Sequence, residues 1–146
     1  MGEKVRKPCF DTNVIAYYIE KNKVFGSAAK RLFKTLKARK QTGFVTFLSI
    51  SELLVKPISD NNQPLVDYYN SIEINLPVKT LFVDQSSIEL IARLKNKYSL
   101  KTPDAINLAI AISNNCDTFF TNDEALKKVS EIKILLLSEL KKESRS

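Results

Sequence analysis

Apolar residues in this chain alternate between two spacings, one typical of buried strands and one typical of helices. Runs of β-branched and aromatic residues beside turn residues predict strands at residues 5–10, 43–47, 80–83, 118–121 and 133–137. Apolar side chains spaced three and four apart predict helices at residues 12–20, 29–36, 49–56, 65–72, 104–113 and 123–129, with a further long helix after Asp84. Strands that alternate with helices favour right-handed crossovers. We therefore predict an α/β fold, a three-layer α/β/α sandwich with a central, mostly parallel sheet.

Proline and polar residues mark the expected ends of several elements. Pro57 is expected to stop the helix 49–56, and residues 59–64 have the composition of a loop. Asp84 is a plausible N-cap, and Thr102 with Pro103 fits an N-cap followed by proline at the first helical position. We expect one domain over residues 1–140, followed by a flexible polar tail at residues 141–146.

The chain has no histidine, and this excludes more chemistry than any other feature of its composition. Ser-His-Asp and Cys-His triads, a histidine general base and zinc sites with imidazole ligands are all excluded. Three glycines are too few for a P-loop or a dinucleotide-binding fingerprint. Carboxylates, hydroxyls, lysines and a metal ion remain as candidates for chemistry.

The cysteines and the hydropathy bear on the cellular compartment. Cys9 and Cys116 lie in apolar stretches without C-x-x-C spacing, so we expect two buried free thiols. No segment approaches the roughly 18 to 20 apolar residues that span a bilayer, and no signal-peptide core follows the basic N-terminus. We therefore expect no contact with a membrane and a cytoplasmic location.

Four acidic residues follow, or lie just beyond, the expected strand ends. Asp11 closes the first strand, Glu52 lies early in the helix after strand 43–47, Asp104 opens an apolar helix and Asp123 follows strand 118–121. Ligands of open parallel sheets bind outside the carboxyl ends of the strands. These four carboxylates are therefore expected to lie near one another.

Each acid also has a purely local alternative role. Asp11 and Asp123 could each cap the helix that follows. Glu52 could belong to a capping box that begins at Ser49. Asp104 could serve only as a negative charge in the first turn of its helix, where it suits the helix dipole.

Capping alone does not explain why four charged acids fall in the same layer, because neutral Ser, Thr or Asn would cap without mutual repulsion. A hard divalent cation such as Mg²⁺ or Mn²⁺ prefers carboxylate oxygens, so it needs no histidine. A cation held in this way can activate water and stabilise the transition state of phosphodiester hydrolysis. The missing histidine and the acidic set therefore both favour a metal site.

The charge balance indicates a polyanionic partner. The chain carries 23 basic and 16 acidic residues, a formal net charge of +7. Such a surplus attracts the phosphate chain of nucleic acid, although a basic stretch is more often a solvated helix face. The candidates for contact with nucleic acid are Lys30, Arg31, Lys34, Lys37 and Lys101.

Four motifs, in this order, resemble those of the PIN-domain family. They are Phe10-Asp11-Thr12-Asn13-Val14, Ser51-Glu52-Leu53, Thr102-Pro103-Asp104-Ala105-Ile106 with the apolar residues 108–111, and Phe120-Thr121-Asn122-Asp123. Each motif is weak by itself, whereas the ordered set is fairly specific. The resemblance spans nearly the whole chain, from Cys9 to about Leu137.

The resemblance implies a metal-dependent ribonuclease, most often the VapC-like toxin of a type II toxin–antitoxin pair. Asp11, Glu52, Asp104 and Asp123 match the acidic quartet of the family, with Asp11 and Asp104 expected as the innermost ligands. Asn13 matches a residue that supports the first acid, and Thr121 matches a hydroxyl near the fourth. Such proteins usually form homodimers, and an antitoxin protein silences the toxins.

Other functions and two further acids stay open at this level. A housekeeping nuclease of RNA maturation, or a non-catalytic RNA-binding module, could share the same fold. Lys101 stands where many relatives carry arginine, so it keeps the charge without the bidentate geometry. Asp117 could be a fifth acid, but its place before a strand favours a loop role, and Glu124 is better explained as a first-turn charge.

Overall fold

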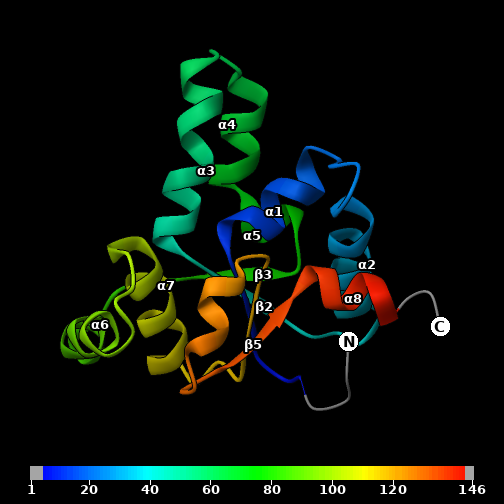
Figure 1. Cartoon of the computed structure of the whole chain (residues 1–146). Helices are drawn as coiled ribbons and strands as arrows, with labels where there is room; N and C mark the ends of the chain where they lie inside the picture. Colours follow the sequence, from blue (N-terminus) through cyan, green and yellow to red (C-terminus); the bar gives the residue numbers. More distant parts are fainter. Residues whose placement is uncertain (1–4, 144–146) are drawn as a thin grey trace.

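A five-stranded parallel sheet forms the centre of the protein. The computed structural model describes residues 5–143, with side chains to residue 140, and Figure 1 shows its helices packed around the strands. The strands are β1 (Pro8–Phe10), β2 (Gly43–Thr46), β3 (Val78–Leu81), β4 (Thr118–Thr121) and β5 (Lys133–Leu136). Their order is β3-β2-β1-β4-β5, and all four pairings are parallel.

Helices connect the successive strands, and one more helix follows the last strand. They are α1 (Thr12–Ile19), α2 (Gly26–Ala38), α3 (Phe47–Ser59), α4 (Gln63–Asn70), α5 (Ile72–Asn75), α6 (Gln85–Tyr98), α7 (Thr102–Ser113), the 3₁₀ turn η1 (Glu124–Lys128) and α8 (Leu137–Glu143). In the described part of the chain, no helix is long and apolar enough to cross a bilayer.

Alternating side chains along the strands build two separate cores. Phe10, Val45 and Phe120 point to a core that includes side chains of α1, α2 and α3. Cys9 and Phe119, which precede two of them, point to the core beneath α6 and α7. Because successive strand residues face opposite sides of a sheet, this arrangement confirms the predicted three-layer α/β/α sandwich. The two cysteines are buried and free, as expected.

Two strands differ from the sequence prediction in their bounds. The first begins at Pro8 rather than Val5, because the amides of Arg6 and Lys7 donate to the Asp117 carboxylate instead of to a neighbouring strand. The third lies at 78–81 rather than 80–83. Its pairing with β2 ends at Leu81, after which Phe82 and Val83 leave the sheet with exposed side chains.

The prediction that Pro57 ends its helix is wrong. Pro57 is buried inside α3, which continues to Ser59. Proline removes one amide from the helix and does not prevent the next residues from closing a last turn, and here the Asp60 amide donates to the carbonyl of Lys56. The loop expected at residues 59–64 shortens accordingly, because α4 begins at Gln63 behind the N-cap Asn62.

The sequence prediction also misplaces one helix start and misses one helix. The N-cap of α7 is Lys101, without a side-chain capping bond, so Thr102 and Pro103 both belong to the first turn. Leu137 does not end the last strand but begins α8, which continues to Glu143 and packs against α2. The expected tail therefore begins in this helix, and residues 144–146 lie outside the described residues.

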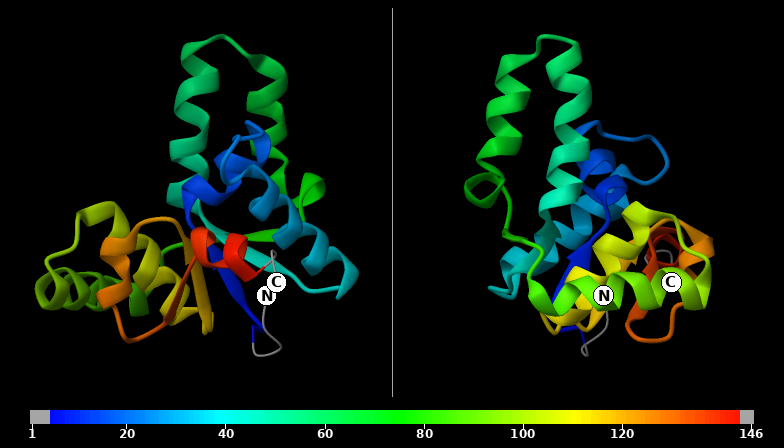
Figure 2. Two further views of the ribbon diagram at one scale, coloured as in Figure 1. Left: turned by 45° about the vertical axis from the view of Figure 1, so that its right-hand side comes forward. Right: turned by 90° about the vertical axis from the view of Figure 1, so that its left-hand side faces the viewer.

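The pair α3 and α4 stands away from the sheet as a helical hairpin, as both views of Figure 2 show. At its foot, α3 starts directly after β2, so its first turns lie at the carboxyl end of the strands. The starts of α1 and η1 follow the carboxyl ends of β1 and β4 in the same way. This edge of the sheet is where the predicted acids are found.

Candidate active site

Four chain segments each bring one acid to the carboxyl edge of the sheet. Asp11 is the N-cap of α1, Asp104 lies in the first turn of α7 and Asp123 is the N-cap of η1. Glu52 lies in the second turn of α3. Asp11 and Asp123 therefore do cap helices. Capping alone does not explain why all four acids lie at the same edge of the sheet.

Asp11 is the most restrained of these acids. Its carboxylate is only 9% exposed and accepts two hydrogen bonds, from the Thr12 amide at 2.8 Å and from the Thr121 hydroxyl at 2.7 Å. Its own amide donates to the Phe120 carbonyl, which fixes the start of α1 to β4. Thr121 also accepts from the Asp123 amide at 3.1 Å, so one hydroxyl connects the first and fourth acids.

Glu52 is connected to the first acid through Thr12. The alternative role of Glu52 in a capping box is not found, because α3 begins at Phe47 and its N-cap is Thr46, which accepts from the Ser49 amide. Instead the Thr12 hydroxyl donates to Oε1 of Glu52 at 2.8 Å and lies 2.8 Å from the Ser49 hydroxyl. A carboxylate can only accept, so Ser49 supplies the other proton and donates to Thr12.

The electrostatics show that the acids affect one another. Burial raises the pKa of Asp11 above its ordinary value, and the charges of Asp104 and Glu52 raise it further, against the hydrogen bonds from Thr121 and Thr12. Burial is also the main reason why the pKa of Asp104 is raised. The charges of Asp123 and Glu52 add to this effect, whereas the charge of Lys101 opposes it. The site is therefore a cluster of mutually repelling carboxylates.

This donor set fits a hard divalent cation in its chemistry. Carboxylate oxygens are the ligands that such ions prefer, and a cation would relieve the repulsion between Asp11 and Asp104. The side chains do not form a finished cage, because among the described residues no three acidic, cysteine or histidine side chains converge on one point. Asp11 is fixed by hydrogen bonds, whereas Asp123 is exposed.

A buried polar contact behind the acids was not predicted from the sequence. Thr46 and Asn107 are 0% and 3% exposed, and the Thr46 hydroxyl donates to the Asn107 side-chain oxygen at 2.5 Å. Asn107 lies one turn after Asp104 in α7, and Thr46 caps the helix that carries Glu52. The contact therefore fixes two acid-bearing helices to each other. Its only signal in the sequence is an asparagine within an apolar helix.

The structure places the remaining predicted residues in separate locations. The Asn13 side chain is exposed and makes no hydrogen bond to any other residue that the structure describes. Asp117 belongs to the opposite end of the sheet, where it accepts from the amides of Arg6 and Lys7. Glu124 lies in the first turn of η1, as expected. Neither acid joins the cluster.

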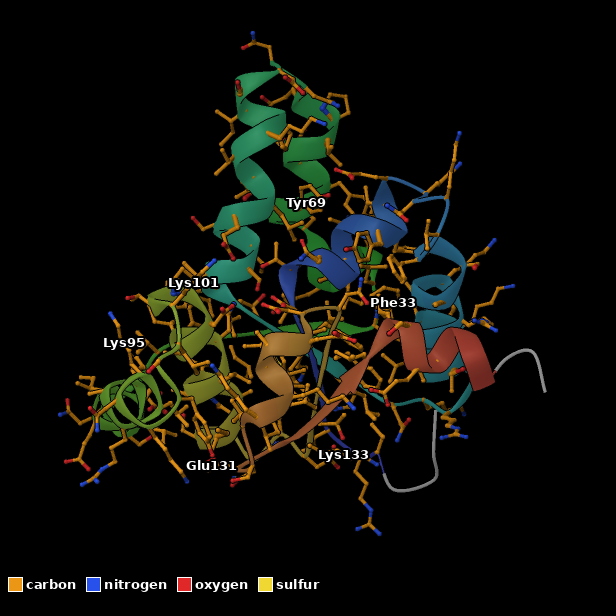
Figure 3. All side chains as sticks on the ribbon, in the orientation of Figure 1. Phe33, Tyr69, Lys95, Lys101, Glu131 and Lys133 are labelled. Atoms are coloured by element: carbon orange, nitrogen blue, oxygen red, sulfur yellow. The ribbon has the colours of Figure 1, made fainter. Side chains whose placement is uncertain are left out.

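The predicted basic residues do not form one surface. The side chains of Lys30, Arg31, Lys34 and Lys37 are exposed on α2. Lys101 lies at the start of α7 beside Asp104, at the foot of the helical hairpin, whereas α2 lies on the other side of the molecule in Figure 3. The structure therefore provides one cation beside the acids and a separate basic helix face.

Comparison with known families agrees with this arrangement. The family profile described as PIN domain matches residues 9–132, which includes every acid of the site. The chain belongs to the PIN-domain family. The match confirms the resemblance seen in the four sequence motifs, and it covers the whole sheet except the last strand.

Solved structures of VapBC and VapC proteins share the fold at low sequence identity. VapBC2 from Rickettsia felis, bound to a promoter DNA fragment, is 16% identical with a TM-score of 0.71, over 89% of this chain and 98% of that one. DNA-bound VapBC from Salmonella typhimurium is 17% identical with a TM-score of 0.70, over 90% and 98%. VapC20 from Mycobacterium tuberculosis, described as a sarcin-ricin loop cleaving toxin, is 15% identical with a TM-score of 0.63, over 86% and 98%. A search of curated proteins gives no match.

Proposed function

We propose that the protein is a metal-dependent endoribonuclease that hydrolyses RNA phosphodiester bonds with the help of Mg²⁺ or Mn²⁺. The observation that carries this proposal is the cluster of Asp11, Glu52, Asp104 and Asp123 at one edge of the sheet. The pKa values of Asp11 and Asp104 are raised by burial first and then by neighbouring carboxylates, and this supports the proposal because a bound cation would offset the repulsion between them.

Asp11 and Asp104 would be the innermost ligands, and Glu52 and Asp123 would hold a second ion or its waters. A bound divalent cation supplies an activated water and offsets charge on the phosphate oxygens. The chain itself orients the ligands, since Thr121 and Thr12 hold the Asp11 carboxylate and Thr12 holds Glu52. Lys101, beside Asp104, is placed to attract the phosphate of the bound strand.

Cleavage of RNA by purified protein tests this proposal. With Mg²⁺ or Mn²⁺ the wild type should cut, and Asp11→Asn or Asp104→Asn should lower the rate by at least about a hundredfold while leaving the circular dichroism spectrum unchanged. A chelator should stop the wild type. Cleavage by Asp104→Asn at the wild-type rate in Mg²⁺ would show that this carboxylate has no part in the reaction.

We further propose that the nuclease is the toxin of a type II toxin–antitoxin system. Several structural neighbours were solved as toxin–antitoxin complexes, which supports a short antitoxin protein as partner. Induced expression should arrest growth, and co-expression of the product of the neighbouring upstream gene should restore it. Healthy growth under strong induction of a soluble, active enzyme favours the alternative, a housekeeping nuclease of RNA maturation.

A non-catalytic RNA-binding module is the alternative from a different class. The four acids argue against it, because a module that only binds RNA gains nothing from repelling carboxylates next to phosphate. Binding without cleavage in any divalent metal would favour this alternative. The cellular location proposed for each of these functions is the cytoplasm.

A homodimer is proposed as the assembled form. Ile74 and Phe82 flank the edge strand β3 and are 86% and 66% exposed, which is a large apolar surface to leave in water. Sedimentation of the wild type should give a dimer, and Phe82→Ser should weaken it. A monomer at micromolar concentration contradicts this part of the proposal.

A further inference from the structure

A second concave site lies away from the acids, where three helices meet. A pocket of about 520 Å³ is lined by the end of α1, the start of α2 and one residue of α4. Figure 1 shows α4 above α1, with α2 beside it. The side chains that bear on its chemistry are those of Tyr18, Lys21, Asn22, Ser27, Lys30 and Tyr68.

Two lysines give the pocket a positive charge. Lys21 and Lys30 both line it, and both are exposed. The three ion pairs found among the described residues involve neither of them. A phosphate group entering the pocket would therefore meet two ammonium groups without displacing a carboxylate from either.

The start of α2 adds no acidic side chain to the pocket. No acid lies in the first turn of α2, and its N-cap Phe25 makes no side-chain capping bond. Gly26 suits this position, because a Cβ would make tight contacts, 3.1 Å from the Lys21 carbonyl carbon and 3.2 Å from the Tyr17 oxygen. The close approach brings the start of α2 against the end of α1, and thus places Lys21 and Lys30 around the same hollow.

Two phenol rings supply the apolar part of the pocket. The Tyr18 ring packs on Phe33 with ring centroids 5.0 Å apart, and the Tyr68 ring packs edge-on against Tyr69 at 5.8 Å. Both rings are therefore half-buried against the core, and both border the pocket. Burial, and then the proximity of Tyr18, raise the pKa of Tyr68, so its hydroxyl keeps its proton and can donate.

We propose that this pocket is a subsite for one nucleotide of the RNA strand, with Lys21 and Lys30 at the phosphate and Tyr18 and Tyr68 at the base. The inference rests on the proposed ribonuclease function. Paired cations beside aromatic rings are the usual means of binding single-stranded nucleic acid, in which base contact and phosphate attraction act together. An acidic peptide would use the cations without needing the rings, so the combination favours a nucleotide.

The position of the pocket suits a single strand that also reaches the acids. Helix α1 begins at Thr12, whose amide holds Asp11, and ends at Ile19, which lines the pocket. Eight helical residues span about 12 Å, so a few nucleotides connect the two sites. The subsite would therefore determine which stretch of RNA is aligned for cleavage, and would act on binding more than on the chemical step.

Shortened RNA substrates test this inference directly. Dissociation constants are measured in the Asp104→Asn background, which prevents cleavage, for oligonucleotides trimmed one nucleotide at a time from either end. With the pocket unaltered, the affinity for RNA should fall roughly tenfold in a single step when trimming passes one particular length. Lys21→Ala with Lys30→Ala should bind the long strand about as weakly as the shortened one and show no such step, and Tyr68→Phe should reduce the step.

A matched control separates the subsite from general charge. Lys128→Ala with Lys133→Ala removes the same charge from exposed positions on the far side of the sheet, and Figure 3 shows Lys133 at the end opposite the helical hairpin. This variant should keep the step, and Lys21→Arg with Lys30→Arg should restore it. As a second measurement, RNA carrying 4-thiouridine should crosslink to the segment that contains Tyr68.

Each other outcome overturns the inference in a distinguishable way. A step that persists in the Lys21 and Lys30 alanine variant, or no step in the parent protein, shows that the pocket takes no nucleotide. If the Lys21 and Lys30 alanine variant keeps the step but no longer binds a co-expressed antitoxin, the pocket binds a peptide. RNA that binds with the step but is never cut by the wild type in any metal leaves the subsite standing and removes the proposed enzymatic function.

Discussion

Two carboxyl groups of the acid site, those of Asp11 and Asp104, have pKa values raised first by burial and then by neighbouring carboxylates. A raised pKa means that the folded chain binds protons at these groups more readily than the unfolded chain. The contribution of each group to the free energy of unfolding is therefore fully present below the ordinary aspartate pKa of about 3.9. This contribution falls as the pH rises towards the higher pKa of the folded state. Above that pKa the loss of stability is complete and stays constant.

Asp104→Asn tests this sign, because it removes one charge from the cluster. Without divalent metal, the variant should be slightly more stable than the wild type at pH 7, by up to about 1 kcal/mol since the group is partly exposed to solvent. At pH 4 the difference should nearly vanish. Urea unfolding at both pH values measures it. A variant less stable than the wild type at pH 7 would show that Asp104 makes a favourable contact in the absence of metal.

The buried hydrogen bond between Thr46 and Asn107 gives a second prediction at this scale. Thr46→Val keeps the shape of the side chain but leaves the Asn107 oxygen unpaired, which should cost about 1 to 3 kcal/mol in the free energy of unfolding. Catalytic rate should also fall by about tenfold or more, because the helices bearing Glu52 and Asp104 lose a fixed contact.

Thr46→Ser is the matched control, since it retains the hydroxyl. It should recover most of the rate, whereas its stability stays below the wild type by the lost methyl group. Rate and stability that fall together in both variants, in proportion, would indicate a purely structural contact without influence on the positions of the acids.

Among the elements, the start of the sheet depends on Asp117 in place of a longer first strand. Its carboxylate accepts from the amides of Arg6 and Lys7, which join the N-terminal segment to the beginning of β4. Asp117→Ala should lower the free energy of unfolding by about 1 to 2 kcal/mol and leave RNA cleavage within about twofold of the wild type. Chemical unfolding and initial rates measure both. Loss of cleavage in a folded variant would restore Asp117 as a fifth functional acid.

The elements also show what local sequence signals can predict. The strand at residues 118–121 has the predicted bounds, because four consecutive buried residues are flanked by polar ones. The seven-residue helix after Leu136 was not predicted, because its formation depends on packing against α2, and local signals do not report such contacts. The same limit explains the wrong prediction at Pro57. Whether a helix continues past a buried proline near its end depends on the residues that pack over it.

The residues of the candidate site also divide into those that local sequence signals predict and those that depend on distant contacts. Asp11, Glu52, Asp104 and Asp123 could be found in the sequence, because each follows a strand or lies early in a helix, and parallel strands end at one edge. Thr12 and Asn107 could not, because their partners lie 40 and 61 residues away in the sequence. Contacts of this kind depend on the register of the sheet and on helix packing, neither of which has a local pattern.

At the scale of the whole molecule, the net charge of +7 and the acidic site occupy different regions. The acids gather at the carboxyl edge of the sheet, whereas exposed lysines and arginines follow the outer face of α2 and extend to Lys40. A polyanion would be attracted over a wide surface and then meet a cluster that repels it unless a cation is bound. Such a distribution makes metal binding and RNA binding interdependent, so each should strengthen the other.

The salt dependence of RNA binding provides the last prediction, which belongs to the whole surface. Each lysine that contacts a phosphate of a single strand releases counterions, so removing it should reduce the slope of log K against log salt by roughly 0.7. Lys34→Ala with Lys37→Ala, on the exposed face of α2, should therefore reduce the slope by about 1 to 1.5 and weaken binding to all RNA sequences alike. Binding titrations between 50 and 200 mM salt, the range of about fourfold over which such slopes are usually taken, measure this change.

The Lys128 and Lys133 double alanine variant carries the same net charge and should keep the wild-type slope. Equal slopes in both variants would show that Lys34 and Lys37 do not contact RNA, so that Lys101 and the pocket lysines would be left as the phosphate contacts of the described chain.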